Sequence, residues 1–299
     1  AMIVCFGSIN LDLIFPVPTL PQAGQTVLGR AMRVEPGGKG ANQAVAAARD
    51  GARVAFAGAV GRDAFATQAT ALMRAAGVDL SRVIAADTST GAAAICVDPH
   101  GANQIAVAAG ANLQARAAQV EDALLGPGNT VLVQCETDLQ EVAALIGRAH
   151  IRGARVVLNL APAAPLPEPA LRATSLIVVN EDEAASLAAH LGSAADAAGL
   201  RAALGPDVVV TMGGAGLVAA TAAGLTQIAA HKVAVVDTTA AGDCFVGVLA
   251  AALDRGLDLP TALRRANVAA ALCCTRAGSQ GSLPVAAETD AALGSRSGG

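Results

Sequence analysis

The chain has 299 residues, of which 54% are hydrophobic and 15% are charged, and its formal net charge is −4. This length and composition predict one large α/β domain that can bury a sizeable core. Aromatic residues make up 2% of the sequence, with neither Trp nor Tyr, so the chain has neither the basic surface nor the stacking residues that nucleic-acid binding requires.

Strand-like runs and alanine-rich helical stretches alternate along the sequence. The apolar, strand-like runs lie at 2–7, 53–60, 130–134, 154–160, 175–180 and 207–212. Helices are predicted at about 39–49, after Asp63, after Asp138, from about Glu181, and near 242–255 and 260–276. This alternation indicates βαβ units, and therefore a mainly parallel central sheet flanked by helices.

Two regions break the alternation, because β-like segments follow one another with turn residues and no helix between them. They are residues 11–18 with 25–34, and residues 91–108. We expect a single domain over 1–299, with the strands of a small lid sheet inserted at about 10–36 and 90–109. Such a lid would cover substrate at the carboxyl ends of the main strands. The Gly-rich end after Gly294 is expected to be frayed.

Cysteines and histidines give no sign of a disulfide framework or a zinc site. The six cysteines lack C-x-x-C spacing and most lie in apolar runs, as reduced buried thiols do. The four histidines lack paired spacing, and we expect them to be surface or structural. No signal-peptide pattern opens the chain, and glycines interrupt the uncharged run 208–230, which favours short strands over a membrane span. A cytoplasmic location without a membrane partner is expected.

Polar residues near the amino end suggest a binding surface. Asn10 and Asp12 are two residues apart and point to the same face if this segment is extended, either into a site or into solvent. In "PGGKGANQ", Gly38 allows close backbone approach, and Lys39 stands at a helix start, where the dipole disfavours a cation. Asn42 lies one turn further on. A cation in this position indicates that Lys39 belongs to a functional site. The alternative is that its side chain is only solvated.

The stretch "VDTTAAGDCF" brackets a small, flexible segment with Asp237 and Asp243. If Ala240 to Asp243 turn into a helix, their N–H groups form an anion hole suited to a phosphoryl group, and Asp243 can accept the proton of an attacking hydroxyl. Asp237 could hold a cation behind the loop. The alternative is that Asp243 is only a helix cap.

Ten motifs, among them "GSINLD", "PGGKGANQAVAAARDG", "VNEDEA", "VTMGGAG" and "VDTTAAGDCFVG", occur in one order from Gly7 to about Pro284. In this the chain resembles the ribokinase branch of the PfkB carbohydrate kinase family, with its ribokinase-like fold. Neither glycine cluster alone is specific, because Gly40 follows Lys39 where a Walker A loop has Ser or Thr, and "TMGGAG" is not a G-x-G-x-x-G fingerprint.

The resemblance implies an ATP-dependent kinase for a furanose hydroxyl, with Asp243 as base and Ala240, Ala241 and Gly242 as the anion hole. It implies that the sugar is held by Asn10, Asp12, Gly38, Lys39, Asn42 and Glu136. Asn180 and Glu183 would organise phosphate and hydrated Mg²⁺, and the nucleotide would be lined by Thr211, Gly213, Gly214, Gly216 and Asn267. A monovalent cation, K⁺, would be surrounded by Asp237, Thr239, Cys273, Arg276, Gly278 and Ser282. A homodimer through the lid is also implied.

The favoured substrate is D-ribose, phosphorylated at its 5-hydroxyl, and a nucleoside or another furanose is the alternative. A nucleoside would need an apolar or aromatic slot for its base, and the sequence offers few aromatic residues. A catalytically silent sugar sensor is disfavoured because Gly242 and Asp243 are both present. Two departures from similar ribokinases, Gln25 in place of a common Glu and Asn267 in place of an occasional His, leave the acceptor open.

Overall fold

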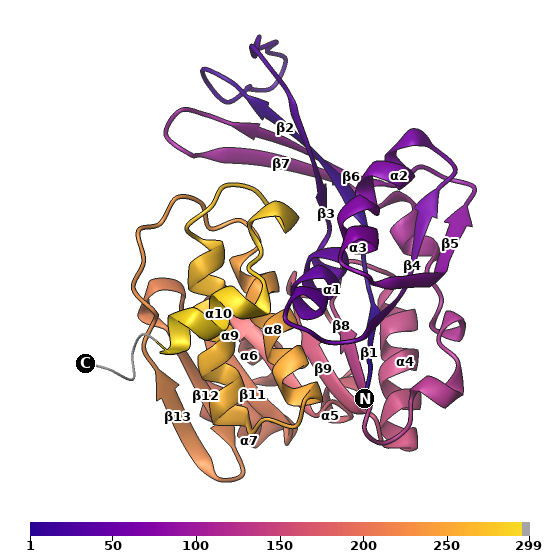
Figure 1. Ribbon diagram of the computed structural model, residues 1–299, viewed down its shortest axis with the longest axis vertical. Coiled ribbons are helices and arrows are strands. Elements are labelled where there is room, and N and C mark those ends of the chain that lie inside the picture. Colours follow the sequence, from indigo (N-terminus) through magenta and orange to yellow (C-terminus); the bar gives the residue numbers. More distant parts are fainter. Residues whose placement is uncertain (295–299) are drawn as a thin grey trace.

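The computed structural model describes residues 1–294, and the expected frayed end after Gly294 lies outside them (Figure 1). A nine-stranded sheet with the order β13-β12-β11-β10-β9-β8-β1-β4-β5 runs through the molecule. Its strands are β1 (Ile3–Phe6), β4 (Val54–Gly61), β5 (Asp79–Ala86), β8 (Thr130–Val133), β9 (Arg155–Asn159), β10 (Leu176–Asn180), β11 (Asp207–Thr211), β12 (Leu217–Thr221) and β13 (Gly224–Ile228). Every pairing from β11 to β5 is parallel, and β12 and β13 add an antiparallel edge.

Helices cover both faces of this sheet because its strands are apolar on both sides. In β1, Ile3 and Cys5 belong to one buried cluster and Val4 and Phe6 to the other. The first cluster packs under α1 (Lys39–Arg49), α2 (Ala64–Ala69), α3 (Ala71–Ala75), α8 (Ala241–Asp254) and α9 (Leu259–Cys273), with α10 (Ala286–Gly294) against α9. The second packs under α4 (Leu139–Arg152), α5 (Glu168–Arg172), α6 (Glu181–Leu191) and α7 (Ala197–Leu204).

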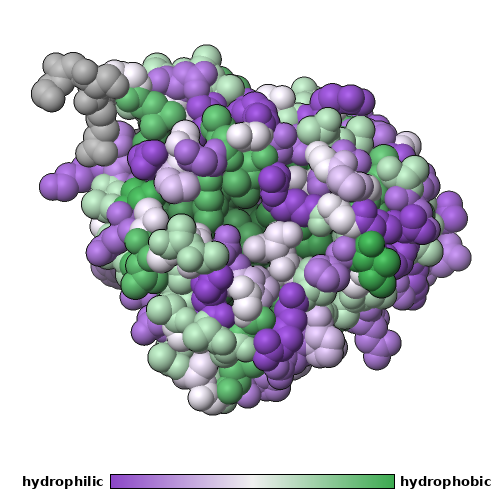
Figure 2. Space-filling model, turned by 90° about the horizontal axis from the view of Figure 1, so that it is seen from below, coloured by the Kyte–Doolittle hydropathy of each residue, from purple (hydrophilic) through white to green (hydrophobic). Residues whose placement is uncertain are grey.

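Short 3₁₀ turns complete the connections: η1 (Gly110–Gln114), η2 (Ala117–Gln119), η3 (Asp122–Leu124), η4 (Gly213–Ala215) and η5 (Gln280–Ser282). Seen from below, opposite the lid, the molecule presents hydrophilic residues around a central hollow in which hydrophobic residues gather (Figure 2).

A second sheet of four strands projects from one end of the main sheet and forms the lid (Figure 1). Its order is β3 (Arg33–Gly37), β2 (Asn10–Pro16), β6 (Gly91–Val97) and β7 (Asn103–Ala108), with β2 and β6 parallel and the two outer pairs antiparallel. Only residues 7–9 separate β1 from β2, so Asn10 lies where the chain leaves the main sheet for the lid.

The predicted α/β class with a mainly parallel sheet and a small β lid is confirmed, but some elements differ. Residues 25–32, predicted as part of a strand, form none, and β3 begins at Arg33. Leu28 and Met32 are 85% and 52% exposed, so their apolar character reflects no buried sheet face. Strand β5 and helices α5, α7 and α10 had no sequence prediction.

The uncharged run 208–230 forms most of β11 and all of β12 and β13, as the interrupting glycines suggested. Over residues 1–294, none of the helices is long and apolar enough to cross a membrane. All six cysteines are free thiols, four of them buried, in agreement with the sequence prediction.

Candidate active site

The candidate site lies where α8 begins, at the carboxyl ends of the parallel strands. A pocket there is lined by residues from the ends of β9 and β10, including Asn159 and Asn180, and from the first turn of α8, including Gly242 and Asp243. Lys39, at the start of α1, completes it. Segments that are far apart in the sequence therefore meet at one edge of the sheet, where open α/β folds bind their ligands.

Asp243 is held in a fixed orientation at the floor of this pocket. Its Oδ2 accepts a hydrogen bond from Asn42 Nδ2 and its Oδ1 accepts one from Gln43 Nε2, both at 2.9 Å. Burial raises the pKa of Asp243, while the charge of Lys39 and the two amide donors act to lower it and Glu136 acts to raise it. A buried, oriented carboxylate with a raised pKa is suited to accept a proton.

Asp243 does not cap its helix, since α8 has no side-chain cap hydrogen bond and the Asp243 carboxylate bonds to two α1 amides instead. Ala240 precedes the helix in the left-handed conformation with φ of 59°, and it is the one non-glycine residue with positive φ among those described. The Cys244 N–H bonds to Ala240 O and the Ala241 N–H bonds to Thr238 O at 3.2 Å, whereas the Gly242 and Asp243 N–H groups have no backbone partner within residues 1–294. Gly242 leaves that turn open to an anion.

A row of buried amides behind Asp243 was not found from the sequence. Gln43 Nε2 also donates to Asn159 Oδ1 at 2.9 Å, and Gln43 Oε1 accepts from Gln134 Nε2 at 2.7 Å. Gln43 and Gln134 are fully buried. The signal was present, because Gln134 and Asn159 are polar residues at the carboxyl ends of apolar strands and Gln43 is a polar residue in an Ala- and Val-rich helix.

Lys39 lies in the pocket rather than in bulk solvent. Its pKa is raised, first by the charge of Asp243 and then by Glu136 and Glu183, although burial opposes the shift. The cation is therefore matched to a group of carboxylates, which explains its position at a helix start. An anionic ligand placed between α8 and Lys39 would meet both the helix N–H groups and this charge.

The predicted sugar residues form a polar group between the lid and α1. Asn10 Oδ1 accepts a hydrogen bond from Asn112 Nδ2 at 2.8 Å, and Asn112, buried and missed by the sequence analysis, also binds the backbone of Ile9. Glu136 Oε2 accepts hydrogen bonds from Ser8 Oγ and from the Lys39 N–H. These contacts leave the group preorganised.

Asp12 differs from its neighbours because, within residues 1–294, no side chain or backbone group donates a hydrogen bond to its carboxylate. Burial, and then the charges of Glu136, Glu35 and Asp243, raise the pKa of Asp12 to about 7. Gly38, with φ of 89°, lets α1 approach closely: a Cβ there would lie 2.8 Å from Asn10 N. Asp12 thus offers free acceptor oxygens in a crowded polar site.

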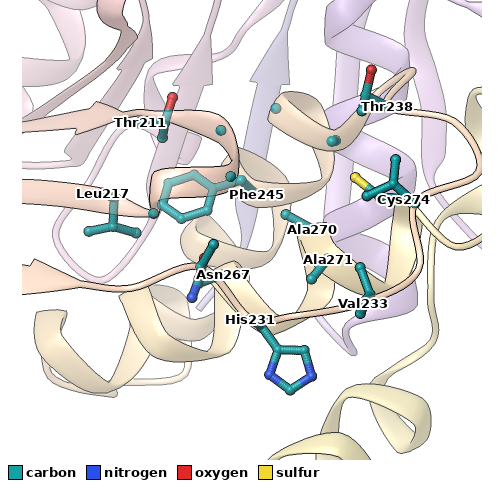
Figure 3. Close-up of a pocket in the computed structure, with 17 residues that line it drawn as sticks. Thr211, Leu217, His231, Val233, Thr238, Phe245, Asn267, Ala270, Ala271 and Cys274 are labelled. Atoms are coloured by element: carbon teal, nitrogen blue, oxygen red, sulfur yellow. The ribbon is translucent and has the colours of Figure 1, made fainter.

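The predicted nucleotide residues line one neighbouring pocket (Figure 3). Its walls are mostly apolar or backbone, with Leu217 and Phe245 on one side and Val233 and Ala271 on the other. The sequence-predicted members that line it are Thr211, Gly213, Gly214, Gly216 and Asn267. Ala241 and Gly242 border this pocket as well as the Asp243 pocket, so the two are continuous at the start of α8.

His231 also lines this pocket, although the sequence suggested a surface or structural histidine. Its Nδ1 is buried and has no hydrogen-bond partner among the described residues. Asn267 Nδ2 donates to Ala229 O at 2.8 Å and so ties α9 to the segment after β13. No sequence pattern pointed to His231, because its position depends on the turn between β13 and α8.

Asn180 and Glu183 form a capping box at the start of α6. The Asn180 N–H donates to Glu183 Oε2 and the Glu183 N–H donates to Asn180 Oδ1, both at 2.8 Å. Burial raises the pKa of Glu183, and the Asn180 bond and Lys39 oppose the rise. Both side chains line the Asp243 pocket.

The predicted cation residues are brought together behind α8. Asp237 Oδ1 accepts from the N–H and Oγ of Thr239, and its Oδ2 accepts from the Gly278 N–H at 3.0 Å. Burial acts to raise the pKa of Asp237, but these bonds to Thr239 and Gly278 prevail and lower it. Cys273 Sγ lies 3.1 Å from Ser282 Oγ. The Arg276 guanidinium instead pairs with Glu288 of α10, so only its carbonyl is available to a cation.

Comparison with known proteins agrees with this geometry. The model of the family described as "pfkB family carbohydrate kinase" matches residues 1–286. A ribokinase from Haemophilus influenzae is 35% identical over 291 residues, which are 95% of each chain.

Solved structures agree as well. A ribokinase from Thermotoga maritima superposes with a TM-score of 0.89 at 29% identity, covering 98% of this chain and 99% of that one. A ribokinase from Arabidopsis thaliana, solved with ribose and ATP, gives 0.87 at 27% identity with 98% of both chains covered. A nucleoside kinase from Burkholderia thailandensis, solved with inosine, gives 0.86 at 25% identity over 99% of this chain and 97% of that one.

Proposed function

Since this chain belongs to the pfkB family of carbohydrate kinases, we propose that it transfers the γ-phosphate of ATP to the 5-hydroxyl of D-ribose. The product is ribose 5-phosphate. The full-length similarity to ribokinases and the similarity to a structure that holds ribose and ATP support this substrate pair.

The observation that carries the proposal is the position of Asp243. It stands at the open start of α8, where Lys39 and Asn42 of the predicted sugar group approach the apolar pocket around Phe245. In the proposed reaction Asp243 accepts the proton of the sugar 5-hydroxyl as that oxygen attacks the γ-phosphorus. The N–H group of Gly242, with Lys39, stabilises the charge on the transferring phosphoryl group, while the Ala241 N–H is bonded to Thr238 O at 3.2 Å and holds the turn before α8.

The sugar residues have complementary roles in this proposal. Ionised Asp12 accepts hydrogen bonds from sugar hydroxyls, because its oxygens have no other hydrogen-bond donor within residues 1–294. Asn10, fixed by Asn112, presents its Nδ2 donor, and Asn42 holds Asp243 while contacting the sugar. The backbone at Gly38 closes over the ring, and Glu136 fixes the Lys39 backbone.

Magnesium fits the site as a hydrated ion. Within residues 1–294 there is no cluster of three or more His, Cys, Asp or Glu side chains that could hold a metal. Mg²⁺ needs no such cluster, since it keeps several waters and binds one or two carboxylates together with substrate phosphates. Glu183, with Asn180 beside it, is the proposed anchor. When bound, the ion neutralises phosphate charge, and Lys39 positions the γ-phosphate for transfer.

A monovalent cation fits the segments 237–239 and 273–282, which offer one ionised carboxylate and several backbone oxygens. We propose that Asp237 and the carbonyl or hydroxyl groups of Thr239, Cys273, Arg276, Gly278 and Ser282 surround K⁺. Its charge would favour the conformation of Ala240 that opens the anion hole.

We also propose a homodimer that forms through the lid in a cytoplasmic enzyme. Ile105 and Val107 on the edge strand β7 are 55% and 60% exposed, and an exposed apolar edge strand favours pairing with a second copy. Sedimentation analysis of the wild type and of Val107→Lys tests the dimer: the substitution should shift the protein toward monomer.

The acceptor is tested by coupling ATP turnover to ADP detection with ribose, deoxyribose, fructose and several nucleosides. Ribose is expected to give the highest kcat/KM. A nucleoside kinase is the alternative, and the similarity to the Burkholderia thailandensis nucleoside kinase solved with inosine supports it. Higher kcat/KM for a nucleoside than for ribose would replace the ribose assignment, and no turnover with any acceptor would contradict a kinase.

A further inference from the structure

Strand β3 of the lid is joined to the loop that connects α9 to α10. Glu35 Oε2 accepts the Ser279 N–H at 3.1 Å, and Ser279 Oγ donates to Pro36 O at 2.7 Å. The Glu35 side chain is only 23% exposed, and its other charged contact is Arg33 Nε at 3.6 Å. The link is therefore made by a largely covered carboxylate.

The same loop is bonded to the proposed cation residues through the preceding residue. The Gly278 N–H donates to Asp237 Oδ2 at 3.0 Å, and Asp237 Oδ1 holds the Thr239 N–H at 2.8 Å. Two successive N–H groups of one turn thus bind two carboxylates, one from the lid and one from the segment that leads into α8. Thr239 is the residue before Ala240, so this chain of bonds ends at the anion hole.

Glycine at position 278 is required for this arrangement. Its φ is +98°, and a Cβ would lie 3.0 Å from Glu35 Oε2. The loop therefore approaches the lid with no side chain at this position, and any movement of Glu35 displaces the turn directly.

On its other side, Glu35 faces the sugar group. It is the cross-strand partner of Asp12 in the antiparallel pair β2 and β3, and directly opposite residues place their side chains on the same face. Two like charges in this relation repel one another. If Glu35 only held Ser279, a neutral Gln would do so without this repulsion, so the charge needs a further explanation.

We propose that Glu35 is a positioning residue that couples the sugar site to the cation loop, an inference that rests on the proposed roles of both sites. Sugar hydroxyls that donate to Asp12 reduce its repulsion of Glu35. Glu35 then binds Ser279 more firmly, which steadies Gly278 and Asp237. Sugar and K⁺ therefore strengthen each other's binding, and linkage requires the same factor in both directions.

Calorimetric titration of D-ribose into the full-length protein, in K⁺ and in tetramethylammonium buffer, measures this factor without turnover. For the wild type, we expect ribose to bind about fivefold or more tightly in K⁺, the lower end of ordinary coupling. In Glu35→Gln the Ser279 acceptor remains but the charge is lost. The ribose affinities in the two buffers should then differ by no more than about twofold. Glu35→Ala should do the same. The matched control Asp98→Ala, which removes a carboxylate from the turn between β6 and β7 of the same lid, should keep the wild-type factor.

Thermal unfolding of the sugar-free wild type with and without K⁺ separates the two ways in which the inference can fail. If K⁺ raises the midpoint but ribose affinity is the same in both buffers, or if the wild-type factor persists in both Glu35 variants, the coupling role is refuted while the cation site stands. If K⁺ changes neither the midpoint nor turnover, the cation site itself is refuted, and the coupling with it.

Discussion

The sugar side and the nucleotide side of the site are lined by different kinds of chemical group. Around Asp12, polar and charged side chains from the lid, α1 and the loop after β8 form a closely bonded group. Around Phe245, the pocket is lined by glycine backbone and small apolar side chains, with few polar atoms. Affinity for the sugar should therefore depend on single side chains, whereas affinity for the nucleotide should depend on the shape of the backbone.

The largest expected effect is at the junction of the two sides, in Asp243→Asn. The amide cannot accept a proton, and general-base catalysis is typically worth about 10²- to 10⁴-fold, so kcat should fall by about that factor. Folding should survive: the new amide can donate to Asn42 if that side chain flips, and Asn42 Oδ1 is buried without a partner. ATP affinity should stay within about threefold.

Asp258→Asn is the matched control for this substitution. Asp258 caps α9 through the Thr261 N–H, and Asn is a comparable cap, so kcat should not change. Folded Asp243→Asn protein that retains more than about a tenth of wild-type kcat would show that the base lies elsewhere.

The second largest effect should be loss of sugar affinity in Asp12→Ala. A hydrogen bond to a charged group contributes about 1.5 to 3 kcal/mol, so losing one or two such bonds should weaken ribose binding by at least about tenfold. Nucleotide affinity should not change, because Asp12 lies outside the pocket around Phe245. Calorimetry with ribose and with an ATP analogue measures both.

Asp98→Ala is the control in the same lid. Asp98 closes the turn between β6 and β7 through the His100 and Ala102 N–H groups, away from the sugar group. Equal ribose affinity in wild type and Asp12→Ala would remove Asp12 from the site and weaken the contrast between the two sides.

The sequence predicted local elements better than contacts between distant segments. Helix α1 was predicted at its observed bounds, because Gly38 and Lys39 mark its start and Arg49 its end. Gln43 and Asn159 were missed, since their pairing depends on how α1 packs on the sheet, which no local pattern states. The contacts of Glu35 with Ser279 join residues 244 positions apart, and His231 reaches its pocket through an irregular segment.

A smaller effect, confined to the sugar side, is expected from pH. The pKa of Asp12 is raised to about 7 by burial and by Glu136, Glu35 and Asp243. Only the ionised form accepts two hydroxyl bonds, so ribose affinity should fall by about tenfold as pH is lowered from 8 to 6. Because the folded pKa is raised, the sugar-free protein should instead lose stability as pH rises through 7.

Ribose titrations at several pH values, in wild type and in Asp12→Asn, test this. The variant should show no inflection near pH 7, while nucleotide affinity should follow the same pH profile in both proteins. A wild-type profile that is flat over this range would mean that Asp12 is already fully ionised at the lower pH.

The smallest effect should come from the nucleotide side, in Asn267→Ala. Its amide donates to Ala229 O at 2.8 Å, so it positions backbone, and the neutral bond is worth about 1 kcal/mol, or about fivefold in affinity. ATP affinity should fall by no more than that, with kcat and ribose affinity unchanged. Asn129→Ala is the matched control, since its amide also donates to a carbonyl, that of Leu124, outside the pocket. A loss of ATP affinity as large as the loss of ribose affinity in Asp12→Ala would show that Asn267 reads the base directly, and that side chains govern both sides of the site.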